Sequence, residues 1–298
     1  MSHPGRLENK VAIITGGGLG LGEGIVRKFV FEGAKVLIFD INAKTANSVA
    51  SSLDSKSVSV FEGDVTNPSH WDAAVKAAID TFGRLDIVVN NAGVVHNAQA
   101  SDTVPFEEYE RIMKINVSPL YHSAKAARPI FETQKSGVFV NISSISAPRP
   151  RPNLVWYAGS KGAVSAITKG LAAEFAKFGV RCNAICPVAA STGMMASVLG
   201  GNDSEEGRAV LVKAIPLGRV AEPKDVGNAA AWLASDEAGF ITGYVFFFFL
   251  LIARYFWGVF GEGWDGANSF KGGTESLLTV FLLHYRIELP VDGGRALQ

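Results

Sequence analysis

The stretch VAIITGGGLGLG, at residues 11–22, decides the fold of this 298-residue chain. Its first part, Val11–Ile14, is a short apolar run that is typical of a buried parallel strand. Glycines follow at once, and residues 24–30 (GIVRKFV) then place apolar side chains at helical spacing. A strand, a glycine turn and a helix in this order form the context that a dinucleotide-binding fingerprint requires.

The glycines of the turn predict a phosphate-binding loop. Gly16, Gly20 and Gly22 are spaced Gly-xxx-Gly-x-Gly. Glycine permits positive φ and lets a backbone approach a phosphate without a Cβ, and the start of the next helix adds free N–H groups and a favourable dipole. Because the spacing differs from Gly-x-Gly-x-x-Gly, a tight turn in an unrelated α/β fold is the alternative.

An acidic residue at the end of the second strand favours NAD over NADP. The strand over 35–39 (KVLIF) ends at Asp40, about 20 residues beyond the glycines, where a carboxylate would bond a ribose 2′-hydroxyl and repel a 2′-phosphate. The glycine turn and Ile41-Asn42 offer no cation that would offset this repulsion. The alternative is that Asp40 only caps the following helix.

A tyrosine and a lysine in WYAGSKGAV indicate proton transfer. Tyr157 and Lys161 are four residues apart, so one face of a helix can carry both. A base working near neutral pH needs a tyrosine pKa about 3 units below its usual value of roughly 10, which takes on the order of 4 kcal/mol. A nearby ammonium and a positive nicotinamide ring can supply that energy. The alternative is an ordinary surface pair.

A third strand ends in a serine that can bond a substrate oxygen. Residues 138–142 (VFVNI) predict this strand, and Ser143-Ser144 follow it. A helix or turn cap is the alternative role for either serine.

With these features the chain resembles the short-chain dehydrogenase/reductase family. The resemblance implies an α/β fold, a doubly wound parallel sheet (Rossmann-type) flanked by helices, in a single dinucleotide-binding catalytic domain over residues 1–298. The matching motifs run in family order: TGGGLGLG (15–22), Asp64-Val65, NNAG (90–93), Asn116 in KINV, NISS (141–144), YAGSK (157–161), IPLGRVAEP (215–223), ITG (241–243) and DGG (292–294).

The resemblance also implies roles for individual residues. Ser144 would position the substrate oxygen, Tyr157 would be the general acid/base, Lys161 would lower its pKa and bind the ribose, and Asn116 would hold a water that links Lys161 to solvent. Asn90 would steady the central strand, and Thr192 would bond the nicotinamide carboxamide. The implied cofactor-binding residues are Gly16, Gly20, Leu21, Gly22, Asp40, Asp64, Val65, Asn90, Ala92, Gly93, Tyr157, Lys161, Pro187 and Thr192.

The expected activity is NAD-dependent interconversion of a secondary alcohol and a ketone, including ketone reduction, with no metal ion. The alternative is a catalytically silent NAD-binding scaffold or regulatory protein on the same fold. One departure bears on this choice: the family usually has Pro-Gly where this chain has Pro187-Val188. Valine adopts positive φ only at a cost, so we expect a different shape for the nicotinamide-side loop.

Composition limits the partners. The chain has 28 basic and 28 acidic side chains, which gives no electrostatic footprint for nucleic acid. Cys182 and Cys186 flank a strand and predict buried free thiols, compatible with a reducing compartment. Residues 1–10 (MSHPGRLENK) lack a signal-peptide core, so we expect a cytoplasmic protein. The resemblance implies a homo-oligomer, a dimer or tetramer.

A segment near the C-terminal end breaks the family pattern. Residues 244–291 separate ITG from DGG, where the family has a strand of about five residues. We interpret 245–288 as an atypical insertion that replaces or extends the last strand, and it casts doubt on the family's usual oligomer. A membrane anchor is disfavoured because the apolar stretch 245–260 has 16 residues, against roughly 20 needed. A genuine insertion and a translated non-coding segment, such as a retained intron, remain open.

Substrate specificity is expected on loops at the carboxyl ends of the strands. Candidate stretches are 94–97, 146–156 and 192–214. The arginines of PRPRP (148–152) could meet an anion or be solvated loop charges. His96 could contact substrate or have no role, and Trp156 could wall the pocket or pack between helices.

Overall fold

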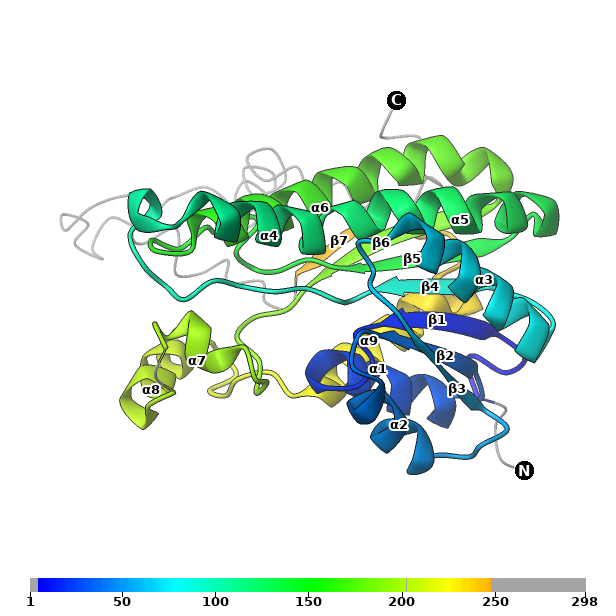
Figure 1. Cartoon of the computed structure of the whole chain (residues 1–298), viewed down its shortest axis with the longest axis horizontal. Coiled ribbons are helices and arrows are strands. Elements are labelled where there is room, and N and C mark those ends of the chain that lie inside the picture. Colours follow the sequence, from blue (N-terminus) through cyan, green and yellow to red (C-terminus); the bar gives the residue numbers. More distant parts are fainter. Residues whose placement is uncertain (1–4, 202, 248–298) are drawn as a thin grey trace, which may run out of the picture.

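The computed structural model describes residues 5–201 and 203–247, and its centre is a parallel sheet of seven strands (Figure 1). The strand order β3-β2-β1-β4-β5-β6-β7 confirms the predicted α/β, Rossmann-type architecture. The strands are β1 (Val11–Thr15), β2 (Lys35–Asp40), β3 (Val58–Glu62), β4 (Ile87–Asn90), β5 (Gly137–Ile142), β6 (Val180–Cys186) and β7 (Val245–Phe247).

Helices cover both faces of this sheet. One face packs against α1, α2 and α9, and the other against α3, α5 and α6 (Figure 1). Short 3₁₀ turns cover Ser101–Thr103, Ala176–Phe178 and Asp236–Ala238. The helices are α1 (Gly20–Phe31), α2 (Ala43–Ser51), α3 (Pro68–Phe82), α4 (Phe106–Asn116), α5 (Ser118–Gln134), α6 (Val155–Phe175), α7 (Met195–Val198), α8 (Glu205–Lys213) and α9 (Pro223–Ala234).

The first strand shows why a continuous apolar run forms a central strand here. Ala12 and Ile14 pack into the cluster beneath α1 and α9, whereas Val11 and Ile13 pack into the cluster of α3, which includes Trp71. Successive side chains of a strand point to opposite faces, so burial on both faces requires every position to be apolar.

The strand order reverses between β1 and β4, and polar side chains join the two strand ends there. The Thr15 hydroxyl accepts hydrogen bonds from the backbone N–H groups of Asn91 and Ala92, both at 2.9 Å. The Asn91 side chain donates to the Thr15 carbonyl over 2.8 Å. Ligands of open α/β sheets bind outside the carboxyl ends of the strands at such a reversal, so these bonds frame the candidate site.

The atypical segment begins as a regular part of the sheet. Val245 is in register with Ala184, and Phe247 with Cys186, so β7 extends the sheet in parallel beyond β6. The rest of the proposed insertion, from residue 248 to 288, and the DGG motif lie outside the described residues. Within the described part of the chain, no helix is both long and apolar enough to cross a membrane.

Candidate active site

The glycine turn has the backbone shape that a bound phosphate needs. Gly16 and Gly20 adopt positive φ of 63° and 58°. A Cβ on Gly22 would lie 1.9 Å from the Gly16 carbonyl oxygen, so only glycine fits where α1 folds back on the turn. Leu19, the N-cap of α1, provides no side-chain cap. The first N–H groups of α1 are therefore available to an anion.

Asp40 lies at the end of β2 and faces this turn. One carboxylate oxygen accepts from the Gly18 N–H and the other from the Asn42 N–H, each over 2.9 Å. Asn42 is the residue that caps α2, because its side chain accepts from the backbone of Lys44 and Thr45. The alternative that Asp40 merely caps the following helix is therefore wrong.

Asp64 and Val65 follow the neighbouring strand, β3, on the same edge of the sheet. The Asp64 carboxylate accepts from the Thr66 N–H over 2.8 Å, and the Val65 carbonyl accepts from the Trp71 indole over 2.9 Å. The Gly63 N–H donates to the Asp40 carbonyl over 2.9 Å. These contacts bring 64–65 next to the end of β2.

Ser144 and Tyr157 meet at the start of α6. Ser144 follows β5, and its hydroxyl is hydrogen-bonded to the Tyr157 phenol. The Ser146 N–H donates to the same serine oxygen over 3.1 Å. Burial raises the pKa of Tyr157, and the bond with Ser144 opposes that rise. The protein's own groups thus raise the pKa of Tyr157 and hold the phenol protonated at neutral pH. A base that works at neutral pH would need this pKa to be lowered instead.

Lys161 lies one helical turn along α6 and is buried. Its Nζ donates to the Ile142 carbonyl over 2.8 Å and stands 6.0 Å from the centroid of the Tyr157 ring. Burial lowers the pKa of Lys161 to about 8. Ser143 holds the helix backbone here, because its hydroxyl donates to the Lys161 carbonyl over 2.8 Å.

Asn116, the last residue of α4, joins the loop after β4 to α6. Its side-chain oxygen accepts from the Val94 N–H over 2.7 Å, and its amide donates to the Val94 carbonyl and to the Ser160 hydroxyl. A Cβ on Gly93 would lie 3.2 Å from both the Asn116 oxygen and the Lys161 ammonium. Glycine at this position therefore lets the loop pass close to both side chains.

Asn90 ends β4 and crosslinks the middle of the sheet. Its amide donates to the Ser123 hydroxyl of α5 over 3.0 Å and to the Asn141 side chain of β5 over 2.9 Å. Ala92, two residues further, is held through its N–H by Thr15.

The loop after β6 returns toward the glycine turn. The Pro187 carbonyl accepts from the Ile145 N–H over 2.9 Å. A Cβ on Gly20 would lie only 3.3 Å from the Thr192 methyl group, so this threonine faces the turn. Among the described non-glycine residues, only Asn9, Lys135 and Asn153 have positive φ. Val188 therefore avoids the left-handed conformation.

Trp156 packs against a neighbouring helix on the substrate side. The Trp156 indole donates to the Ser101 carbonyl over 2.8 Å, and its ring meets Tyr109 edge-on at 5.4 Å. Trp156 thus packs the start of α6 against α4. Cys182 and Cys186 are buried free thiols, as predicted.

Sequence reasoning missed several residues that position this site. Thr15, Asn91, Ser143 and Ser160 position the site through hydrogen bonds to its other residues. The available signal was their place inside the motifs TGGGLGLG, NNAG, NISS and YAGSK. In residues 5–201 and 203–247, no group of three or more His, Cys, Asp or Glu side chains is arranged to hold a metal ion.

Comparison with known proteins gives consistent matches over most of the chain. The family model described as enoyl-(acyl carrier protein) reductase matches residues 17–248. The 4-formylbenzenesulfonate dehydrogenase of Comamonas testosteroni is 43% identical, over 80% of this chain and 95% of that protein. The 3beta-hydroxysteroid dehydrogenase 1 of Eggerthella lenta is 36% identical, over 81% of this chain and 92% of that protein.

A solved structure resembles the described fold. The 3-ketoacyl-(acyl-carrier-protein) reductase of Brucella melitensis, crystallised with NADH, is 38% identical and superposes with a TM-score of 0.76. The match covers 81% of this chain and 97% of that chain.

Proposed function

The chain belongs to the short-chain dehydrogenase/reductase family and is an NAD(P)-dependent oxidoreductase acting on CH–OH donors, and from this premise we propose its catalytic residues and cofactor preference. In this proposal the enzyme interconverts a secondary alcohol and a ketone, with Tyr157 as the general acid/base. The contact that carries the proposal is the hydrogen bond between Tyr157 and Ser144, formed one helical turn from the buried Lys161.

Hydride and proton transfer in the proposed reaction require no co-reactant besides the nicotinamide cofactor. A bound nicotinamide cofactor supplies the hydride for reduction and accepts it for oxidation. In reduction, Ser144 donates a hydrogen bond to the substrate carbonyl oxygen, and Tyr157 transfers its proton to that oxygen as the carbonyl π bond breaks. In oxidation, the Tyr157 phenolate takes the alcohol proton. Lys161 stabilises the phenolate through its positive charge.

Asn116 is assigned an indirect role in proton supply. Its side-chain oxygen and amide are engaged with Val94 and Ser160. We therefore assign its backbone carbonyl to the water that would link Lys161 to solvent. All four proposed catalytic positions carry the residue type that the reaction requires. This favours an active enzyme over a catalytically silent scaffold.

The residues at the strand ends fit an NAD molecule. The positive-φ glycines and the uncapped start of α1 suit the pyrophosphate. Asp40 keeps lone pairs for ribose hydroxyls beyond its two backbone bonds, and its charge disfavours a 2′-phosphate. The proposed cofactor contacts are Gly16, Gly20, Leu21, Gly22, Asp40, Asp64, Val65, Asn90, Ala92, Gly93, Tyr157, Lys161, Pro187 and Thr192.

We further propose that residues 1–298 form one catalytic domain with an atypical insertion at 245–288 that replaces or extends the last strand, and that this insertion is translated non-coding sequence. The relatives support this, since 95% of the Comamonas protein matches only 80% of this chain. Transcripts that lack the segment would be direct support. If a variant without 248–288 fails to fold while the full chain binds NADH, the segment is a genuine part of the protein.

We also propose that the chain forms a homo-oligomer, a dimer or tetramer. Phe106 of α4 and Tyr121 of α5 are apolar side chains that are 64% exposed, as an interface would require. Light scattering of the purified chain distinguishes a dimer or tetramer from a monomer.

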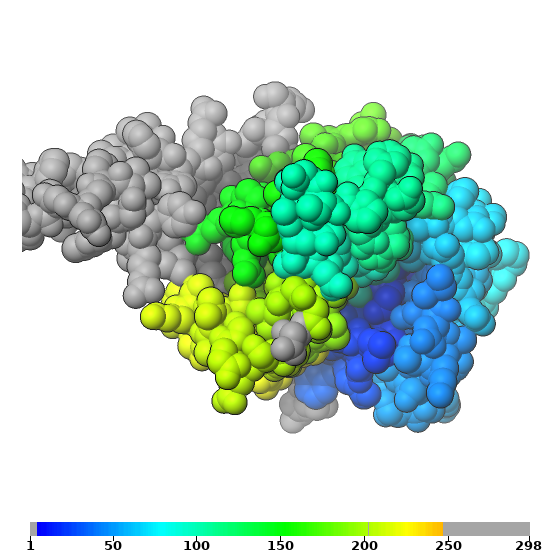
Figure 2. Space-filling model, turned by 60° about the vertical axis from the view of Figure 1, so that its left-hand side comes forward, coloured from blue at the N-terminus to red at the C-terminus, as the bar shows by residue number. Residues whose placement is uncertain are grey.

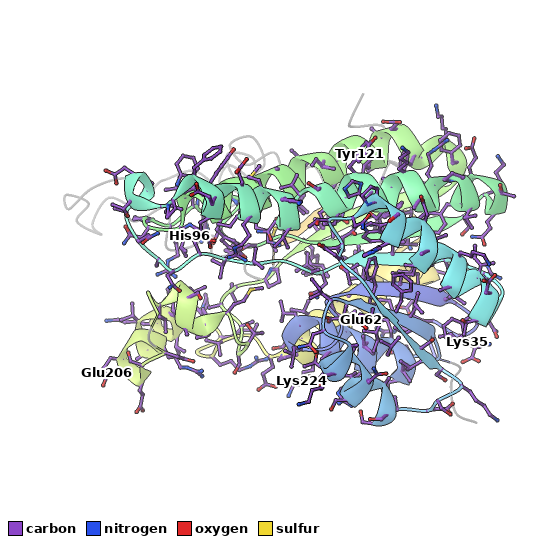
Figure 3. All side chains as sticks on the ribbon, viewed as in Figure 1. Lys35, Glu62, His96, Tyr121, Glu206 and Lys224 are labelled. Atoms are coloured by element: carbon purple, nitrogen blue, oxygen red, sulfur yellow. The ribbon has the colours of Figure 1, made fainter. Side chains whose placement is uncertain are left out.

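The test of the function is cofactor titration paired with turnover. NADH and NADPH are compared over a ketone panel, for the wild type and for Tyr157→Phe, with Tyr121→Phe as the matched control on the outer side of α5 (Figure 3). NADH-dependent reduction that is lost only in Tyr157→Phe supports the proposal. Tight NADH binding with no turnover on any ketone would favour the silent scaffold.

A further inference from the structure

His96 is a buried histidine beside the candidate site with no assigned role. It lies in the loop between β4 and α4 and is 2% exposed (Figure 3). It is three residues beyond Gly93, whose Cβ position is 3.2 Å from the Lys161 ammonium. Three residues span at most about 11 Å. His96 therefore belongs to the short stretch of loop that passes directly beside Lys161.

The hydrogen bonding of His96 leaves one ring nitrogen unused. Its Nδ1 lies 2.8 Å from the Asn97 carbonyl, which can only accept, so Nδ1 carries the proton. A neutral ring then presents Nε2 as an acceptor. Nε2 is buried and has no hydrogen-bond partner among the described residues. A buried acceptor without a partner destabilises the folded chain, so this nitrogen needs an explanation.

A structural role does not explain this histidine. Its ring nitrogen Nδ1 bonds only the next residue in the chain, and within the described residues Nε2 bonds nothing, so no hydrogen bond of the ring ties the loop to another element. The loop is fixed instead by Asn116 at Val94 and by the backbone N–H of Ala98, which donates to the Ser197 carbonyl of α7 over 3.0 Å. An apolar side chain of similar volume could fill the same space.

The elements around His96 are those that border the substrate region. Besides α7 at Ala98, the segment before α6 holds the loop, because the Gln99 N–H donates to the Asn153 carbonyl over 3.0 Å. In the space-filling view, the yellow-green α7–α8 segment meets the teal α4 segment along one seam (Figure 2). Because Nε2 is buried, a substrate can reach it only if a neighbouring element moves, and a single backbone bond of 3.0 Å joins Ala98 to Ser197 of α7.

The charges beside His96 favour a neutral substrate group. Glu108 of α4 interacts electrostatically with His96. The Glu108 carboxylate is held by both arms of the Arg111 guanidinium, each at 2.7 Å. The Glu108–Arg111 pair has no net charge. It supplies no hydrogen-bond donor to Nε2 and does not attract an anionic substrate group.

We propose that His96 is a specificity-determining residue whose Nε2 accepts a hydrogen bond from a substrate hydroxyl, so that the enzyme prefers hydroxyketones and the corresponding diols over plain ketones and alcohols. The inference rests on the proposed function of the same site. A substrate hydroxyl gives the buried acceptor its missing partner, and a substrate without one leaves it unpaired. Sites built for a substrate hydroxyl discriminate strongly for this reason.

The experiment moves a hydroxyl along one carbon chain. NADH-dependent kcat/KM is measured at pH 8 for pentan-2-one, for its 1-, 3-, 4- and 5-hydroxy derivatives, and for 4-oxopentanoate as the anionic analogue. The enzymes are the wild type, His96→Met, which removes the acceptor, and His96→Gln, which restores one. NADH affinity checks that each variant keeps its fold.

The preference is the ratio of kcat/KM for a hydroxyketone to kcat/KM for pentan-2-one. For one hydroxyketone we expect this ratio to be at least tenfold higher in the wild type than in His96→Met. His96→Gln should recover part of the preference. Activity on pentan-2-one is the reference against which each of the three enzymes is compared. Equal preference in all three enzymes would overturn the inference, as would a gain for 4-oxopentanoate that His96→Met removes. No wild-type turnover on any ketone would instead be a failure of the proposed function. If His96→Met loses NADH binding, His96→Gln must retain the preference, and its failure to do so would also overturn the inference.

Discussion

The ammonium of Lys161 donates a 2.8 Å hydrogen bond to the backbone carbonyl of Ile142 at the end of β5. The lysine is 5% exposed, and burial lowers its pKa from 10.5 to about 8. The bond orients Nζ, but it does not replace the water that a cation loses on burial. Lys161 is therefore held in a position that costs stability, and the proposed role in proton transfer would account for it.

Replacing this lysine should stabilise the protein and abolish turnover. For Lys161→Met we expect the free energy of unfolding at pH 7 to rise by about 1–3 kcal/mol. The lysine binds a proton less readily in the folded chain, so its destabilising effect is complete below pH 8. It fades between pH 8 and 10.5. Urea unfolding at pH 7 and pH 10 should show the two proteins converging at the higher pH.

Lys169→Met provides the matched control on the same helix, since Lys169 is exposed. This variant should change neither turnover nor the pH dependence of unfolding. A constant stability difference between Lys161→Met and the wild type from pH 7 to pH 10 would contradict the buried-ammonium explanation.

Ser144→Ala should shift the pH profile of alcohol oxidation. In the proposed reaction, oxidation needs the Tyr157 phenolate, whereas ketone reduction needs the protonated phenol. Burial raises the pKa of Tyr157 and the bond with Ser144 lowers it. Removing the hydroxyl should therefore move the rise in kcat for oxidation to higher pH and reduce its maximum. Ser146→Ala leaves the Ser146 N–H in place and serves as the control; an equal shift in both variants would count against a direct effect of Ser144.

Asp40→Asn should relax the choice of cofactor. The substitution preserves shape but removes the charge that disfavours a 2′-phosphate. We expect the ratio of the NADPH and NADH dissociation constants to fall roughly 10- to 100-fold, equivalent to about 1.4–2.8 kcal/mol. Fluorescence titration measures both constants. Asp54→Asn is the control, because among the described residues Asp54 forms its hydrogen bonds within its own loop, to Lys56 and Ser57. An unchanged ratio in Asp40→Asn would remove Asp40 from the cofactor argument.

Local sequence patterns predicted the parts of this molecule that local physics determines. The apolar run before Gly16 predicted β1 because a strand buried on both faces has no polar position. The four-residue spacing of Tyr157 and Lys161 predicted their common place on α6 because helical geometry fixes it. Such inferences need no knowledge of distant residues.

Contacts between distant residues were beyond the sequence. The bonds between Thr15 and Asn91 join residues 76 apart, and the bond from Asn116 to Val94 spans 22 residues. No periodicity marks such pairs. The direction of the Tyr157 pKa shift was also hidden, because it depends on how completely the folded chain surrounds the phenol. The cap of α2 could be assigned only once Asn42 was seen to accept from the helix backbone.

Gly93→Ala tests how closely the loop after β4 must pass the proposed catalytic residues. The new Cβ would lie 3.2 Å from both the Lys161 ammonium and the Asn116 oxygen, so one of these side chains must shift by a few tenths of an ångström. Small displacements of catalytic groups are costly, and we expect kcat to fall roughly tenfold or more. Gly170→Ala is the control on α6: nothing lies within 4 Å of its Cβ position, and alanine there should raise stability by about 0.5–1 kcal/mol. Steady-state kinetics and thermal unfolding of both variants decide the matter. Full activity in Gly93→Ala would mean that Lys161 and Asn116 tolerate displacement and that their exact positions do not limit the reaction.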